Sequence, residues 1–297
     1  MMHTIRTILS GLSVLTMLGT STHVFSQTVI DWTAGDSSDY YGSVFNWDGL
    51  NVPNTTTESA RFNLAGSYNV TIASGLTTQV SDLIIQQGDI NFASSGAIFA
   101  TYSAADDLIL NGGDLTISRT GGSGNVRLSV GDEINVTGDS SLFVDNGSDI
   151  ITVNLFAGRS SAGDGYVEFD GAGSTLEVTG SVILGSSGQT GTLVFQNAST
   201  GNTIAGTTTL VSGSNVNSEG FLSVLSGAGL TAGNLRVGSL STAASAVQQA
   251  VITVNGAGSV LSQSGASTLT VGDATNPDVI SKVLIQQSGT MATGTGD

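Results

Sequence analysis

A short apolar strand followed by a glycine recurs along this chain at nearly constant spacing. The glycines lie 27, 27, 28, 25 and 34 residues apart, and they are Gly131, Gly158, Gly185, Gly213, Gly238 and Gly272. The residues three before and one before each glycine are apolar, with Ser212 as the exception. Since positions i and i+2 of a strand share a face, each strand has one apolar face. A repeat of this length built from short strands indicates a solenoid.

A second strand follows in a frame that also repeats. Its frames begin at Gly165, Gly191, Gly220, Ala250 and Ser281, and each places two apolar side chains on one side. A third, weaker strand follows a glycine corner in several units, as in residues 170–178 and 255–261. Three strands and three corners make one coil, which is too small to fold alone, so successive coils must stack and pair in parallel.

The predicted fold class is all-β, a right-handed parallel β-helix, because crossover connections between parallel strands are right-handed. The predicted inward residues share their place in the repeat and are Leu128, Val130, Val167, Phe169, Val182, Leu184, Leu193, Phe195, Leu222, Val224, Ile252 and Val254. Glycine totals 41 and proline two, and both Pro53 and Pro277 lie outside the periodic strands. Proline would remove a ladder hydrogen bond from any interior strand.

The chain divides into four expected segments. Residues 1–26 read as a secretory signal peptide, with Arg6 before an apolar run from Ile8 to Leu18 and cleavage expected after Ser26. Residues 27–72 hold both tryptophans and are expected to form an aromatic N-terminal cap. Residues 73–124 are expected to form irregular early coils. Residues 125–297 are expected to form regular coils, the last of them incomplete, so that the chain is a fragment of a longer protein or frays at its end.

Charge and composition exclude several classes of function. The chain holds 23 acidic residues against seven lysines and arginines, with Arg6 in the signal peptide. Such an acidic surface repels nucleic acid and anionic membranes, and it lacks the basic stripe that nucleic-acid binders need. The apolar run in residues 8–18 is about half the ~20 residues that span a bilayer, so no membrane span is expected. Cysteine is absent, so no disulfide or thiol-linked lipid is available.

Several short segments resemble those of exported bacterial repeat proteins. Phe45–Trp47, Val52–Pro53, Ala60–Phe62 and Gly66–Ile72 together resemble the N-terminal segment of large secreted bacterial repeat proteins. The later units look like the repeats of autotransporter-like passenger domains and of secreted proteins from planctomycete-type bacteria. The resemblance covers most of the mature chain and implies a β-helix and export more than any activity. Such proteins usually continue into a translocator barrel or a sorting tail, and this chain shows neither pattern.

Both histidines, His3 and His23, lie in the signal peptide, so imidazole and thiol chemistry are excluded from the mature chain. Carboxylates remain. The candidate cluster consists of Asp164, Glu168, Asp170 and Glu177, with Arg159 nearby, because glycosidases and lyases act with such groups. Glu168 lies between two inward residues, so it is expected to point outward, and a solvated outer face is the favoured interpretation.

Two further patterns allow a ligand or a purely structural role. Asp106–Asp107 and Asp132–Glu133 could bind a structural calcium ion, and residues 121–125 resemble a glycine-rich calcium repeat, with Val126 where an aspartate is needed. Simple turns are favoured over calcium, and no cofactor is expected. Trp32, Trp47, Tyr40 and Tyr41 could stack on sugars, but packing over the end of the core is favoured.

The favoured function is therefore an exported, non-catalytic structural or adhesin-like β-solenoid, secreted or held at the cell surface. Its expected partners are surface polysaccharides or other cell-surface proteins. The alternative is a carbohydrate-active β-helix, a polysaccharide lyase or glycosidase-like enzyme. A concave groove with converging carboxylates and a basic residue would favour the enzyme. No catalytic, cofactor or metal residue is assigned.

Overall fold

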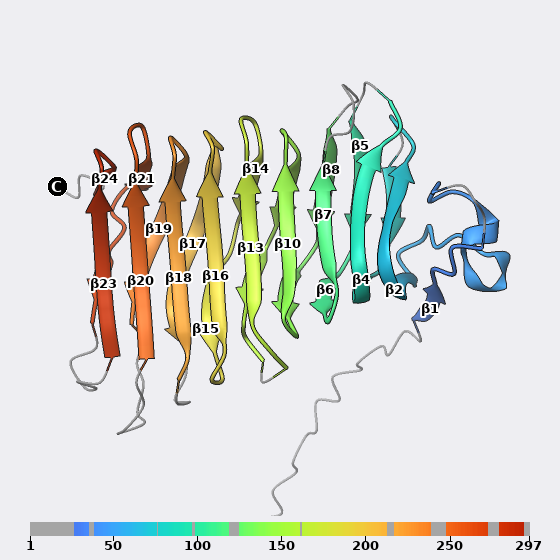
Figure 1. Cartoon of the computed structure of the whole chain (residues 1–297), viewed down its shortest axis with the longest axis horizontal. Helices are drawn as coiled ribbons and strands as arrows, with labels where there is room; N and C mark the ends of the chain where they lie inside the picture. The colour runs from blue at the N-terminus through green and yellow to red at the C-terminus, as the bar shows by residue number, and fades with distance from the viewer. Residues whose placement is uncertain are drawn as a thin grey trace, which may run out of the picture.

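The computed structural model describes residues 27–35, 39–75, 77–96, 99–118, 125–160, 162–212, 217–238, 248–272 and 279–293. These residues form an all-β solenoid of about nine turns with three faces, and almost no helix. Each face is a ladder of parallel strands along the molecule (Figure 1). The predicted signal peptide, Gly213 and residues 121–124 of the calcium-like segment lie outside the described residues.

The strands alternate among the three faces in chain order, and four long strands contribute to two faces each. The first face consists of the last parts of β2 (Glu58–Ile72) and β4 (Leu83–Ser94), then β7 (Asp114–Ser118), β10 (Ser140–Asp145), β13 (Gly165–Asp170), β16 (Thr190–Gln196), β18 (Glu219–Leu225), β20 (Gln248–Asn255) and β23 (Val279–Gln286).

The second face consists of β3 (Thr77–Val80), β5 (Ala100–Ala104), β8 (Val126–Val130), β11 (Asp149–Thr152), β14 (Thr175–Val178), the first parts of β17 (Asn202–Ser212) and β19 (Gly229–Val237), β21 (Val260–Gln263) and β24 (Thr290–Ala292). The third face consists of β1 (Thr28–Asp31), the first parts of β2 and β4, β6 (Leu108–Asn111), β9 (Glu133–Thr137), β12 (Asn154–Ala157), β15 (Val182–Ser186), the last parts of β17 and β19, and β22 (Leu269–Val271).

The coil is right-handed. In Figure 1 the strands of the first face run upward at the front, the chain returns downward behind them, and each turn advances toward the C-terminal end. Every ladder between two strands of the described residues is parallel, as the stacking argument predicted. The register of the first face aligns Gly165, Gly191, Gly220, Ala250 and Ser281, which are the frame starts predicted from the sequence.

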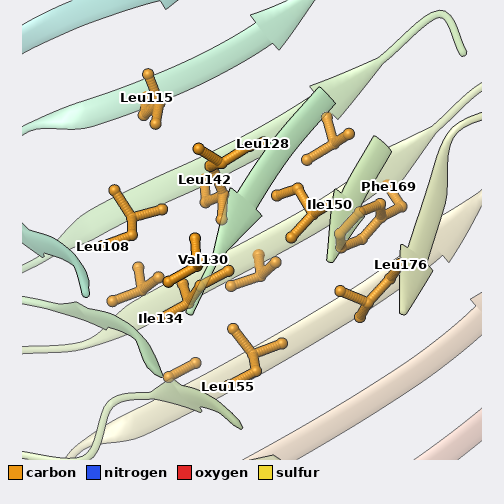
Figure 2. Packing of buried hydrophobic residues seen from close by; sticks show 14 of the residues in the cluster. Leu108, Leu115, Leu128, Val130, Ile134, Leu142, Ile150, Leu155, Phe169 and Leu176 are labelled. Atoms are coloured by element: carbon orange, nitrogen blue, oxygen red, sulfur yellow. The ribbon is translucent and has the colours of Figure 1, made fainter. Parts of the chain in front are cut away.

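A single apolar core fills the inside of the solenoid. All twelve predicted inward residues are buried, from Leu128 in β8 to Val254 in β20. Figure 2 shows side chains from different strands, among them Leu142, Ile150 and Phe169, pointing toward one another around the axis. Phe169 and Phe195 stack in successive coils with ring centroids 5.5 Å apart.

The repeating glycines do not all lie at the same corner of the coil, although their sequence spacing predicts that they do. Gly158, Gly185, Gly238 and Gly272 all adopt positive φ, Gly185 within the third-face strand β15 and the other three directly after a third-face strand. Gly131 instead follows β8 of the second face, and its φ is not positive. The strand register places Val211, with φ of 65°, opposite Gly185, so a β-branched residue takes a conformation that glycine normally supplies. The frame around Gly213 is therefore shifted by two residues from the predicted one.

The N-terminal segment covers one end of the core with aromatic side chains. Trp32 and Trp47 are both 2% exposed, and their rings meet edge to face at 5.0 Å. The indole Nε1 of Trp47 donates a hydrogen bond to the Tyr41 carbonyl oxygen at 2.7 Å. Two short 3-10 turns, η1 (Val44–Asn46) and η2 (Asp48–Leu50), carry the chain around this cluster. Trp32, Trp47 and Tyr41 thus pack over the core, whereas Tyr40 and Phe45 are exposed.

In the last described coil, by contrast, apolar side chains at inward positions are exposed. Ile285 and Val271 occupy inward positions by register, yet they are 51% and 47% exposed. No described segment lies beyond them, whereas the equivalent Val254 and Val237 one coil earlier are buried.

Candidate functional site

At the corner before the third face, acidic side chains of successive coils accept hydrogen bonds from backbone amides. Asp82 Oδ1 accepts the amide of Asp107 at 3.2 Å, and Asp107 Oδ1 accepts the amide of Glu133 at 3.2 Å. In later turns the same corner has asparagines. Asn154, two turns after Asp107, accepts the Ser181 amide at 3.0 Å, and Asn234, three turns further, accepts the Thr268 amide at 2.9 Å. A backbone amide at a corner needs an acceptor, and these side chains supply it from the coil below.

A second acidic ladder stands at the corner before the first face. Asp114 Oδ1 accepts the amide of Ser141 at 2.6 Å. In the next two turns Asp139 Oδ1 accepts the amide of Asp164 at 3.0 Å, and Asp164 Oδ1 accepts the amide of Thr190 at 2.7 Å. Asp164, taken from the sequence as a candidate catalytic carboxylate, therefore ties one coil to the next.

The paired acids considered for calcium belong to the first ladder. Asp106 accepts a hydrogen bond from the Ser81 hydroxyl at 2.8 Å, Asp107 accepts the backbone amide of Glu133, and the Glu133 carboxylate pairs with Arg159. The pKa of Asp107 is raised to about 6, first by burial and then by the negative charges of Glu133, Asp82 and Asp132, against the opposing effect of its hydrogen bond from the Glu133 amide. Within the described residues, no group of three or more potential metal-ligating side chains is close enough to hold an ion.

Glu168 is the centre of a polar cluster on the outer side of the first face. It points outward, as predicted, but it is half-buried and hydrogen-bonded. The Tyr166 hydroxyl donates to Glu168 Oε2, and Gln196 Nε2 donates to Glu168 Oε1 at 2.8 Å. Asn197, the residue after Gln196, donates a hydrogen bond from its Nδ2 to Asp170 Oδ1 at 2.6 Å. Both carboxylates are therefore held by side chains of their own or the next coil.

Asp145 lies beside this cluster, since the register pairs it with Asp170. Its pKa is raised by burial first, and then by the negative charges of Asp170 and Glu168. The pKa of Tyr166 is also raised, first by burial and then by its hydrogen bond to Glu168. A carboxyl group with a raised pKa beside a second carboxylate is the arrangement that acid catalysis needs.

The remaining members of the predicted cluster do not converge on Glu168. Glu177 lies on β14 of the second face and is exposed. Arg159 follows β12 of the third face, where its guanidinium pairs with Glu133 at 3.1 Å and lies over the Phe156 ring at 4.0 Å. The structure thus separates the predicted cluster onto three faces and leaves Glu168 and Asp170 together.

Two open hollows lie on the outer side of the first face. One, of about 230 Å³, is lined by Ser67, Asn69, Asp89, Asn91 and neighbouring residues of β2, β4 and β7. The other, of about 320 Å³, is lined by residues of β10, β13 and β16 and their corner, including Asp139, Ser141, Asp164, Tyr166 and Thr192. Side chains that carry hydroxyl, amide or carboxylate groups line both hollows, together with apolar surface.

The aromatic residues considered for sugar stacking divide into two groups. Trp32, Trp47 and Tyr41 are buried, and the Tyr41 hydroxyl lies 3.0 Å from that of Tyr102. Tyr40 is 38% exposed and forms an isolated bridge with Thr71. A different aromatic pair, Phe143 and Tyr166, lies on the outer side of the first face.

Sequence reasoning missed Asp145, Tyr166 and Gln196 as companions of Glu168. Tyr166 could have been found, because i and i+2 share the outer side of a strand. Asp145 and Gln196 belong to the coils before and after, and their places follow only from the register that pairs Asp145 with Asp170 and Asp170 with Gln196.

Comparisons of the chain with protein-family models, with curated proteins and with solved structures found no match. None of the helices in the described part of the chain is both long and apolar enough to cross a membrane.

Proposed function

We propose that this chain is an exported, non-catalytic β-solenoid that acts as a structural or adhesin-like segment at the cell surface. The observation that carries the proposal is how its carboxylates are used. Asp82, Asp107, Asp114, Asp139 and Asp164 each accept a corner amide from the next coil. These acids therefore have a structural role, and the core beneath them is filled from the aromatic cap to the last coils.

Contacts with partners would be made by the outer faces, because the interior is closed to ligands. The proposed partners are surface polysaccharides or other cell-surface proteins. Nucleic acid is disfavoured because three of the described arginines, Arg61, Arg127 and Arg159, are paired with carboxylates.

Export is tested by expressing residues 1–297 in a bacterial host and determining the N-terminus of the accumulated protein. We expect a chain that begins at Gln27 and is found outside the cytoplasm, with protease sensitivity on intact cells where it stays attached. A matched Leu15→Arg variant breaks the apolar run and should remain uncleaved inside the cell. Cytoplasmic accumulation of the unaltered chain would refute the export proposal.

The second candidate function is a carbohydrate-active enzyme, favoured by Asp145, whose pKa is raised beside Glu168 and Asp170. The test incubates the purified mature chain with neutral and acidic polysaccharides, with and without calcium, and measures reducing ends and unsaturated products. We expect no turnover. Turnover that is lost in both Glu168→Gln and Asp145→Asn would overturn the non-catalytic proposal in favour of the enzyme.

A further inference from the structure

The two hollows on the first face lie along one column of outward side chains. Strand register aligns Ser67 with Asp89 and Asp89 with Asp114. Asp114 in turn accepts the Ser141 amide, and the register continues from Ser141 to Tyr166 and Thr192. Six successive strands, β2, β4, β7, β10, β13 and β16, therefore carry one polar line parallel to the solenoid axis. At ~4.8 Å between strands the line is roughly 24 Å long.

An aromatic platform stands in this line. The rings of Tyr166 and Phe143 have centroids 5.7 Å apart and are inclined at 49°. Because the Tyr166 hydroxyl is bound by Glu168, which Gln196 also holds, the tyrosine ring is fixed before any ligand arrives. A fixed ring loses little conformational entropy on binding.

The charges along the line select against polyanions. Asp89, Asp139 and Asp164 line the two hollows, and Asp114 lies between them. Among the described residues, the one cation that shares this column is Lys282, on β23, four strands beyond Tyr166. A ligand that runs along the line therefore meets hydroxyl, amide and carboxylate acceptors and donors without a compensating positive charge.

We infer that this line, defined by Ser67, Asp89, Asp114, Ser141, Tyr166 and Thr192, binds a linear, uncharged polysaccharide along the solenoid axis. Sugar hydroxyls satisfy the polar groups in the two hollows, and one sugar ring packs on Tyr166. The inference rests on the proposed function, because it names the class of partner that the outer surface contacts.

The binding experiment uses the purified mature chain in native gels that contain one polysaccharide each. The probes are hydroxyethyl cellulose and galactomannan as uncharged linear polymers, alginate as a polyanion and chitosan as a polycation. We expect retardation by at least one uncharged polymer, unchanged between low and high salt, because no ion pair is involved. Alginate should cause none.

The variants test the site itself. Tyr166→Ala should weaken binding by ~10-fold, whereas Tyr166→Phe keeps the ring and should retain most of the affinity. Phe221→Ala is the matched control, since Phe221 lies outward in the same column one strand past Thr192 and outside both hollows. Circular dichroism establishes that each variant is folded.

Three outcomes overturn the inference: no uncharged polymer binds, Tyr166→Ala binds as the unaltered chain does, or Phe221→Ala loses as much affinity as Tyr166→Ala. Retardation by chitosan alone, abolished by salt, would identify a charge-driven surface and would also overturn it. A failure here leaves export and the absence of turnover untouched, because those are measured by the N-terminal sequence, cell fractionation and product release.

Discussion

Replacing Phe195 with alanine tests the central packing claim. Phe195 is fully buried in β16, its ring stacks on that of Phe169 in the coil below, and Val224 follows in the coil above. Truncating a buried phenylalanine costs ~3–5 kcal/mol through lost burial and the cavity left behind. The upper half of that range is expected here, because parallel ladders on both sides hold β16 in place and prevent the cavity from collapsing.

The assay is urea unfolding, followed by far-ultraviolet circular dichroism and by the fluorescence of Trp32 and Trp47 in the cap. Coincident transitions for the two probes justify a single free energy of unfolding. Thr192→Ser, on the outer side of the same strand, is the control and should change that energy by less than about 0.5 kcal/mol. A loss below about 1 kcal/mol for Phe195→Ala, or an equal loss for the control, would mean that the two sides of β16 are wrongly assigned.

Two further predictions concern the corners. Gly185→Ala should destabilise the chain by ~1–3 kcal/mol in the same urea assay, because Gly185 has φ of 73° and a Cβ there would collide with the Glu219 carbonyl oxygen. The control is Gly229→Ala, which should be tolerated because its Cβ would lie 3.9 Å from Thr200 Cγ2. Equal losses of stability in the two variants would contradict the argument. Asp107→Asn should stabilise the chain at pH 8 and not at pH 4. The pKa of Asp107 is raised from 3.8 to about 6, so the folded state binds its proton more tightly and stability falls as pH rises between those values. Melting temperatures measured across that range check the sign, and a variant that is less stable at pH 8 would refute it.

Much of the fold was predictable because first-face strands combine two short-range signals. Gly165, Gly191 and Gly220 each begin a strand, and the apolar residues two and four positions later point inward. Alternation with period two fixes which side chains enter the core, and the repeat fixes which strands are neighbours. The register of this face therefore follows from the sequence alone.

The corners were less predictable, because different corners share the same residue signals. Gly131 follows an apolar strand as Gly158 does, yet it turns the chain from the second face to the third. Val211 occupies a left-handed position, which local preference reserves for glycine or asparagine. The backbone on its two sides is fixed by the pairing of Leu210 with Leu184 and of Ser212 with Ser186. Tertiary pairing overrode the local preference at that corner.

The outer cluster was only partly predictable, since its members come from three coils. Glu168 and Asp170 share a strand and were recognised together. Asp145 precedes Asp170 by one coil and Gln196 follows it, so their proximity depends on coil lengths that vary from turn to turn. Glu177 and Arg159 lie nearer to Glu168 in sequence than Asp145 and Gln196 do, but the corners carry them to other faces.

The corner ladders show which features the fold requires of its acidic residues. Asp82 and Asp107 occupy the same position as Asn154 and Asn234, and all four accept one amide from the next coil. A neutral amide oxygen therefore performs the structural task. The Asp107 carboxylate performs it at the cost of repulsion from the neighbouring negative charges, which an asparagine would not experience. The negative charge of this corner is not required for folding. In general, net negative charge adds repulsion between molecules and opposes the association of exposed sheet faces.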